Sequence, residues 1–383
     1  MTTTIDLVER SGELKAELIE FSRKPRYEQA FREVLSAHKG EGGVIGEGEL
    51  IDALDRLVLQ HRLRSGQTIV EQFVALRSDL PAPERDMLLG WRDVVEGIFE
   101  VVRRDGDVLV VTNLVDELTY RARSNMGGEV FRPLRPCSYV LARFVPIGSE
   151  WLVSGVIRPI ERGRRKVAYA IAAELATKCP ELLFRNPSLL KRGWELQRRD
   201  RDRFVRFFGT DMVLIPGVEL AARMREYLAF SRGEVLAQLA AQKIASLANH
   251  PVVEIDFPPD LTRSDTVAVI YDETEGLCFL GGFGEFERAF TEPTLLDQHR
   301  YRQRVVDYLD DDSVSPLPFR RMAERDPLRA SEVLRRVLCR KSFDWQRDGE
   351  KLMRQRKRSF FDRVPLPRCL PMSTRLATYF GPR

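Results

Sequence analysis

The chain has 383 residues, of which 43% are hydrophobic and 31% are charged, and its formal net charge is +4 at pH 7. This length predicts two or three domains, and this composition excludes wholesale disorder because enough apolar residues are present to form a core. No stretch approaches the roughly 18 consecutive apolar residues of a membrane span, so we expect no membrane partner.

The first ninety residues predict helices. Leu7, Leu14, Leu18 and Phe21 recur at near-helical spacing until Pro25 ends the run. Further segments with the same period follow, so residues 1–90 are expected to form a helical region.

The hydrophobic period changes at Trp91. Five segments rich in β-branched and aromatic residues predict strands over residues 94–103, 108–113, 118–123, 139–145 and 151–157. Asp105-Gly106 between the first two is typical of a type I′ hairpin turn. Closure removes the exposed edges of so short an antiparallel sheet, so residues 91–160 predict a small five-stranded β-barrel, OB-like or SH3-like.

Helical periodicity returns over residues 161–250, which form a second helical region. Residues 251–383 combine predicted strands at 252–257, 267–271 and 277–280 with further helices, and end in a basic C-terminal tail. The predicted fold class is therefore α+β, with a central small barrel between a helical N-terminal region and a helical/α+β C-terminal region.

Several classes of site are excluded. The five cysteines are odd in number and include no C-x-x-C, which excludes a disulfide framework and a structural zinc site. Residues 1–15 hold Asp6, Glu9 and Glu13 and no apolar run, so we expect no signal peptide and a cytoplasmic location. Phosphate-loop, serine-hydrolase and zinc-protease motifs are absent, so no cofactor is predicted, and both enzymatic activity and oligomeric state stay open.

Positive charge is concentrated in two blocks. Residues 158–206 carry 14 Lys and Arg against 6 Asp and Glu, and residues 340–383 carry 12 against 4. Such blocks indicate either an anionic partner or contact with the acidic remainder of the chain.

Basic residues alternate with aromatic ones in the predicted barrel. Alternation along residues 118–123 places Arg121 and Arg123 outward, with Arg143, Tyr139 and Trp151 close in sequence. Arginine beside stacking rings is typical of single-stranded nucleic-acid binding. The same surface could instead bind peptides or brace neighbouring domains.

The densest cluster of charge lies in the tail, where Arg354, Arg356, Lys357 and Arg358 lie within five residues. We expect this run either to contact a polyanion, such as nucleic acid or an acidic protein surface, or to dock into an acidic pocket of the chain itself. The acidic residues near 254–275 could supply that pocket.

Two alternatives concern residues 251–284. Glu254, Asp256 and Asp272 could hold Mg²⁺ for phosphoryl transfer or hydrolysis, although a solvated acidic face explains them more simply. The glycine-rich residues 281–284 could bind an anion, although a tight structural turn is favoured because Glu285 and Glu287 follow.

The leading hypothesis is a non-enzymatic binding or regulatory protein that contacts nucleic acid or another polyanion through Arg121, Arg123, Arg143 and the tail arginines. The alternatives are a metal-dependent phosphoryl-transfer or hydrolytic enzyme and a protein-interaction scaffold whose tail docks in cis.

Overall fold

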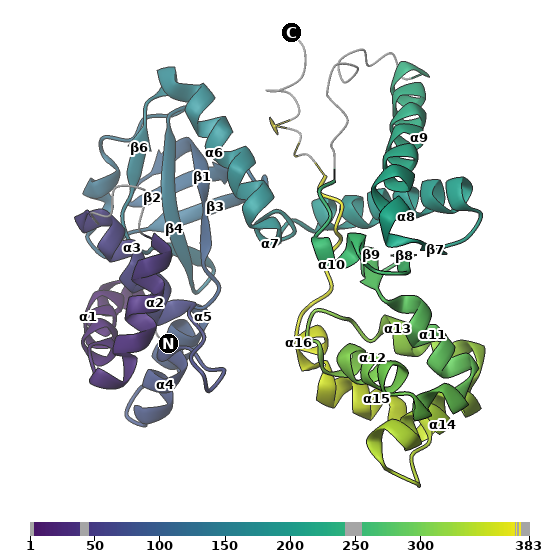
Figure 1. The fold of residues 1–383 in the computed structure, drawn as a ribbon. Helices are drawn as coiled ribbons and strands as arrows, with labels where there is room; N and C mark the ends of the chain where they lie inside the picture. Colours follow the sequence, from purple (N-terminus) through teal and green to yellow (C-terminus); the bar gives the residue numbers. More distant parts are fainter. Residues whose placement is uncertain (1–3, 39–45, 242–254, 372, 374, 377–383) are drawn as a thin grey trace. The chain divides into compact units, whose positions relative to one another are not determined.

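The structure is a computed structural model that describes residues 4–38, 46–241, 255–371, 373, 375 and 376. The chain divides into two compact units, one of residues 1–190 with 372–381 and 383, the other of residues 191–371 with 382. The predicted α+β class is confirmed, because a closed barrel lies between helical segments (Figure 1).

The first unit begins with helices. These are α1 (Thr4–Ser22), the 3-10 turn η1 (Pro25–Tyr27), α2 (Glu28–His38), α3 (Glu47–Leu59), α4 (Ile69–Leu76) and α5 (Ala82–Gly90). Local chemistry sets the start of α4, where the Thr68 side chain accepts from Glu71 N and the Glu71 carboxylate accepts from Thr68 N.

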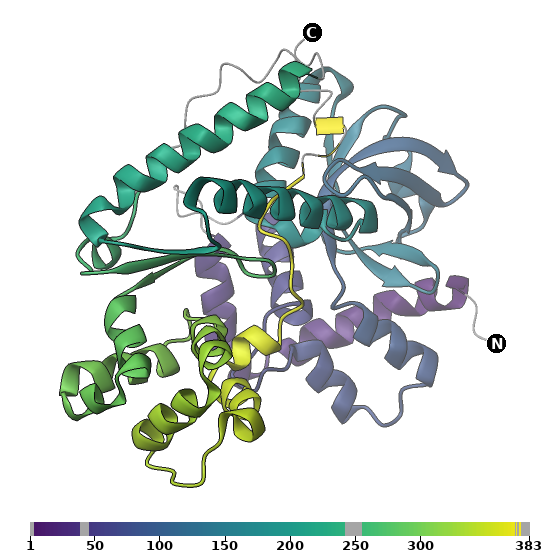
Figure 2. The same cartoon turned by 90° about the vertical axis from the view of Figure 1, so that its right-hand side faces the viewer.

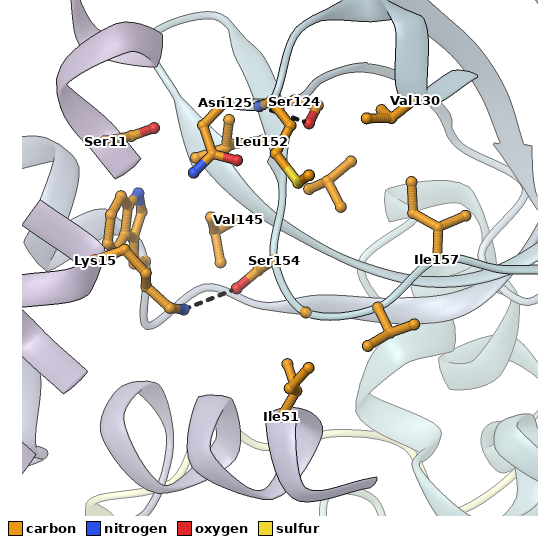
Figure 3. A pocket seen from close by; sticks show the side chains of 15 residues that line it. Ser11, Lys15, Ile51, Ser124, Asn125, Val130, Val145, Leu152, Ser154 and Ile157 are labelled. Carbon is orange, nitrogen blue, oxygen red and sulfur yellow. Dashed lines mark hydrogen bonds between the residues drawn. The ribbon is translucent and has the colours of Figure 1, made fainter. Parts of the chain in front are cut away.

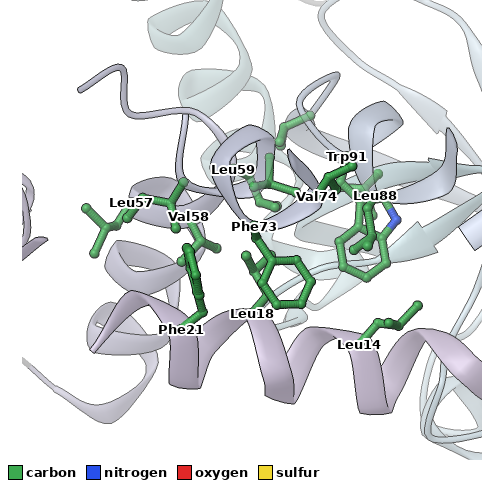
Figure 4. Packing of buried hydrophobic residues seen from close by; sticks show 14 of the residues in the cluster. Leu14, Leu18, Phe21, Leu57, Val58, Leu59, Phe73, Val74, Leu88 and Trp91 are labelled. Atoms are coloured by element: carbon green, nitrogen blue, oxygen red, sulfur yellow. The ribbon is translucent and has the colours of Figure 1, made fainter. Parts of the chain in front are cut away.

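The apolar faces of these helices form one core (Figure 4). Leu14 and Leu18 of α1 pack with Phe73 of α4, and Trp91 at the end of α5 joins the same cluster. Ile147 and other residues at one end of the barrel complete the core, so the helices are held against the barrel.

Six strands follow. They are β1 (Val95–Asp105), β2 (Val108–Asn113), β3 (Thr119–Arg123), β4 (Tyr139–Ile147), β5 (Glu150–Val153) and β6 (Arg158–Ile160). The order is β1-β2-β3-β5-β4, closed by β1 against β4, and β6 adds to the edge of β4. Because β3 and β5 run parallel, the barrel is OB-like rather than SH3-like.

Alternation in β3 places its side chains as predicted. Tyr120 and Ala122 point into the barrel core with Phe99 and Phe144, whereas Arg121 and Arg123 point outward. The predicted strand over residues 151–157 is shorter than expected. Gly155 has a φ of +81°, so the chain leaves the extended conformation after β5 and re-enters it only at β6.

The remaining elements of the first unit are η2 (Gly128–Phe131), η3 (Arg162–Arg164), α6 (Arg165–Lys178), α7 (Pro180–Leu183) and the start of α8 (Pro187–Phe208).

The second unit is built on an antiparallel sheet of β7 (Met212–Ile215), β8 (Val267–Asp272) and β9 (Gly276–Gly281). Alternate residues of β8 serve two cores. Val267, Val269 and Tyr271 pack with α8 and α9, whereas Ala268 and Ile270 pack with the later helices (Figure 2).

The helical elements of this unit, besides most of α8, are η4 (Gly217–Glu219), α9 (Leu220–Ala241), α10 (Pro259–Thr262), α11 (Phe283–Thr291), η5 (Pro293–Asp297), α12 (His299–Asp310), α13 (Leu317–Arg325), α14 (Pro327–Leu338), α15 (Trp345–Arg356) and α16 (Arg358–Phe361). None of the helices in the described ranges combines the length and apolar character needed to cross a membrane.

The strand predicted over residues 252–257 is wrong at its described end. Residues 255–257 have no regular secondary structure, and residues 252–254 lie outside the described residues. Phe257 is buried against Phe279 of β9, with ring centroids 5.1 Å apart. Pro258 and Pro259 follow directly and cannot donate to a strand ladder, so these apolar residues pack as irregular chain.

Candidate functional site

A pocket of about 480 Å³ lies between α1, α3 and the barrel of the first unit (Figure 3). Its wall is mostly apolar, with Val145 from β4, Leu152 from β5, Ile51 from α3 and Ile157 after β5. Both the volume and the apolar lining are typical of sites that bind small molecules.

One end of the pocket is polar. Lys15 of α1 donates to the carboxylate of Asp55 and, at 3.1 Å, to the hydroxyl of Ser154, which itself donates to Asp55. Asp55 is 2% exposed. Burial alone would raise the pKa of Asp55, but Lys15, Ser154 and Arg143 together bring it below its ordinary value. The buried carboxyl of Asp55 is therefore ionised, with the amino group of Lys15 against it.

Arg143 also lies beside Asp55 and connects it to two further polar side chains. Its guanidinium donates to Glu96 at 2.9 Å and to Gln60 at 2.7 Å, and its Nε lies 3.8 Å from Asp55. Because Arg143 comes from β4 and Asp55 and Gln60 come from α3 and its end, the network ties this helix to the barrel.

Two donors at this end lack an acceptor. Lys15 makes two of the three hydrogen bonds open to an ammonium group. Trp91 also lines the pocket, and its buried Nε1 has no hydrogen-bond partner among the described residues. The Lys15 nitrogen lies 5.6 Å from the centroid of the Trp91 ring. A buried donor without a partner costs about 1–3 kcal/mol, so an acceptor placed here would be favoured.

The loop after β3 forms part of the rim. Ser124 accepts from Met126 N at 3.0 Å, and this turn leaves Asn125 and Met126 exposed while they line the pocket. Met126 is 79% exposed and has three freely rotating bonds, so it can adapt to the shape of a ligand.

The structure brings together two of the three predicted barrel arginines. Arg121 and Arg123 both pair with Glu150, and Arg121 also lies 3.2 Å from Asp105. Arg143 does not join them, because its side chain is buried in the network beside Asp55. Contact of a polyanion with Arg121 and Arg123 stays a prediction, and a polyanion would have to compete with these two carboxylates.

The tail cluster lies in the second unit and is divided. Lys357 is fully buried and donates to the carbonyl oxygen of Asp311, and burial lowers its pKa. Arg356 pairs with Asp310 at 2.8 Å and Arg358 with Asp362 at 3.0 Å.

Arg354 lies over the ring of Phe361, with its Cζ 4.7 Å from the centroid. Three exposed guanidinium groups, those of Arg354, Arg356 and Arg358, therefore remain at the end of α15 and in α16.

The predicted carboxylate site is not assembled in the described part of the chain. Oδ1 of Asp272 accepts from the backbone of Thr274 at 2.8 Å and of Glu275 at 3.0 Å, so this carboxylate closes the β8–β9 hairpin. Asp256 lies in irregular chain, and Glu254 lies outside the described residues. Across the described ranges, no group of three His, Cys, Asp or Glu side chains is arranged to hold a metal ion.

Sequence reasoning missed the pocket. The residue that could have indicated it is Asp55, because this acid lies on the same helical face as Ile51 and Val58 within an apolar segment. A charge on an apolar face indicates a buried acid that needs a partner. The identity of that partner was not readable, since Lys15 is 40 residues away in the sequence.

No family model, no curated protein and no solved structure matches this chain.

Proposed function

We propose that the protein is a non-enzymatic binding protein whose first unit takes a small, uncharged and largely apolar molecule. The observation that supports this most is the apolar pocket of about 480 Å³ that ends at Lys15, Ser154 and Trp91. Apolar walls with a few orienting polar groups are the usual design of a small-molecule site.

The polar end indicates what the ligand carries. Because Lys15 and Asp55 neutralise each other, a charged ligand would leave one charge uncompensated in a buried place. The spare N–H groups of Lys15 and Trp91 instead favour an uncharged acceptor, such as a carbonyl or ether oxygen.

The same geometry favours binding over catalysis. A serine nucleophile needs a base that can take its proton, and the group that accepts a hydrogen bond from the Ser154 hydroxyl is Asp55. The lowered pKa of Asp55 makes its carboxylate a weak base, and three partners hold it in place. A cytoplasmic location, expected from the sequence, belongs to this proposal.

Binding of Nile red tests the proposal, because this dye is uncharged, largely apolar and carries a carbonyl oxygen. Val156→Trp places an indole in the pocket and should weaken saturable dye binding about tenfold or more. Val102→Trp adds the same group on the exposed side of β1 and should leave the affinity unchanged. Equal affinity in the two variants would contradict the proposal.

A second candidate function is contact with a polyanion through Arg354, Arg356 and Arg358. The observation that favours it is that the carboxylate pairs of Arg356 and Arg358 are solvent-exposed. Exposed pairs of this kind contribute about 0–1 kcal/mol, so phosphate groups could displace them. Arg121 and Arg123 on the barrel belong to the same candidate.

Salt titration of single-stranded DNA binding tests this second candidate. Replacing Arg354, Arg356 and Arg358 by Gln should weaken binding and flatten its salt dependence. The matched control replaces Arg23, Arg32 and Arg132, which are also exposed and paired with nearby glutamates. Binding that is absent at low salt, or that falls equally in both triple variants, would exclude this function.

A further inference from the structure

Four arginines converge on a second pocket, which lies within the second unit and has a volume of about 410 Å³. Arg263 follows α10, Arg288 belongs to α11, and Arg300 and Arg304 belong to α12. These residues come from three segments of the chain, so only folding brings their guanidinium groups together.

Tyr301 contacts two of these arginines. Its ring is 1% exposed, and the guanidinium carbons of Arg288 and Arg300 lie 5.3 Å and 4.6 Å from its centroid. Arg300 also donates to the Tyr301 hydroxyl at 3.0 Å. The ring therefore anchors two of the arginines that line the pocket.

Neither of these two arginines is closely neutralised. Arg288 lies 3.8 Å from Glu292, at a solvent-exposed pair. For Arg300, no carboxylate lies within 4.0 Å in the part of the chain that the structure describes. Their donors therefore remain available to a ligand.

Gly282 makes room for the third guanidinium. Its φ is +70°, and a Cβ atom built on it would lie 2.6 Å from the Cζ of Arg304. The backbone N–H groups of Gly282 and Phe283 both donate to the carbonyl oxygen of Thr266, which confirms the predicted tight turn. Because these two N–H groups are occupied, the turn offers no donors there to a ligand. Its role is to leave space for the guanidinium group of Arg304 at the pocket wall.

The balance of charge in the pocket favours an anion. The four arginines face three carboxylates, those of Asp260, Asp265 and Glu285, which leaves an excess of one positive charge. Glu285 is engaged by Arg304 at 3.1 Å.

We propose that this pocket binds the phosphoryl group of a small phosphorylated molecule. Guanidinium groups offer paired N–H donors whose spacing matches the oxygens of a phosphoryl group, and several such groups can share its two negative charges. The site is separate from the apolar pocket of the first unit and does not depend on the function proposed for it.

Calorimetric titration of the full-length protein with inorganic phosphate, at an ionic strength held constant with NaCl, tests the assignment. Arg300→Gln and Arg288→Gln should each weaken phosphate binding about tenfold, the effect of losing a hydrogen bond to a charged group. Arg302→Gln is the matched control, because Arg302 lies on the same helix and does not line the pocket. Its affinity should stay within about twofold of the wild type.

A variant that binds phosphate more tightly cannot be explained by misfolding, whereas a variant that binds more weakly can. Asp265 is exposed, so Asp265→Asn should leave the fold intact while it removes one negative charge from the pocket. This variant should bind phosphate several times more tightly than the wild type. The proposal is overturned if the wild type shows no saturable binding, if Arg302→Gln weakens it as much as Arg300→Gln does, or if Asp265→Asn fails to strengthen it.

Discussion

Asp55 and Asp116 are both buried in the first unit, yet their acidities move in opposite directions. Asp55 faces Lys15 and Arg143, and these cations outweigh the desolvation of its carboxylate. Asp116 accepts hydrogen bonds from Tyr120 Oη at 2.5 Å and from Leu118 N at 2.8 Å, both of which are neutral donors. Burial therefore dominates and raises the pKa of Asp116 to about 6.

Ionisation of Asp116 should destabilise the first unit. Its pKa of about 6 in the folded state lies above the ordinary unfolded value. Protonated Asp116 therefore adds to the free energy of unfolding, fully below about pH 4, and this addition is lost as the pH rises through 6. The loss amounts to about 3 kcal/mol at neutral pH. Asp116→Asn should remove this decline, as measured by urea unfolding between pH 4 and 8. An unchanged pH profile in the variant would contradict this assignment.

Removal of one member of the Lys15–Asp55 pair should be more harmful than removal of both. Lys15→Met leaves the Asp55 charge buried and should lower the free energy of unfolding by about 3–5 kcal/mol. Adding Asp55→Asn should restore part of that loss, because the buried carboxylate that has lost its nearest cation is then gone. Lys178→Met, which breaks an exposed pair with Glu174, serves as the control and should leave stability unchanged.

Elements of the second unit approach each other closely where glycine permits it. At Gly217, between β7 and α9, a Cβ atom would lie 2.4 Å from the carbonyl oxygen of Ser264 and 2.5 Å from that of Leu261. Gly217 N donates to Ser264 O at 3.0 Å, so this connection packs backbone against backbone beside α10. Backbone oxygens cannot rotate away as a side chain can, so no larger residue fits without displacing an element.

Two Gly→Ala variants should therefore change the stability of the second unit in opposite directions. Gly217→Ala should destabilise the second unit by more than about 2 kcal/mol, because two elements must move apart. Gly233→Ala, within α9 and with open space around it, should stabilise by about 0.5–1 kcal/mol through helix propensity. Thermal unfolding of the two variants provides the measurement, and destabilisation by Gly233→Ala would count against the reasoning.

The C-terminal segment takes part in both units. Arg363 pairs with Glu275 at 2.8 Å and Arg368 N donates to Gln197 at 2.6 Å, both within the second unit. Ser373 and Leu376 are buried within the first unit, where Ser373 donates to Leu114 O. Over the residues that the structure describes, the chain therefore passes from one unit to the other within α8 and again between Pro371 and Ser373.

Truncation after Pro371 should loosen the first unit. It removes buried Leu376, the hydrogen bond from Arg375 N to Glu117 at 2.8 Å, and the ion pair of Arg375 with Glu100. Amide hydrogen exchange should accelerate in the barrel strands, whereas β8 of the second unit should keep its protection. Arg363→Gln in the full-length chain disturbs the tail only within the second unit and should not affect the barrel. Unchanged exchange in the barrel after truncation would show that the tail is dispensable there.

Much of the fold was readable from short stretches of sequence. The periods of 2 and 3.6 residues are properties of the local backbone, so they identified β2, β3 and the helices of the first ninety residues. They also placed Arg121 and Arg123 outside the barrel. The break between β5 and β6 was missed because the apolar residues continue through Gly155.

The chemistry of the sites was not readable in the same way, because it depends on residues far apart in the chain. Lys15 and Ser154 meet across 139 positions, and Arg123 finds Glu150 across 27. A sequence shows that a guanidinium or ammonium group exists, but packing determines whether that group faces solvent, a carboxylate or a cavity. The burial of Arg143 and Lys357, and the convergence of Arg288 and Arg300 on Tyr301, followed from the three-dimensional arrangement of the elements alone.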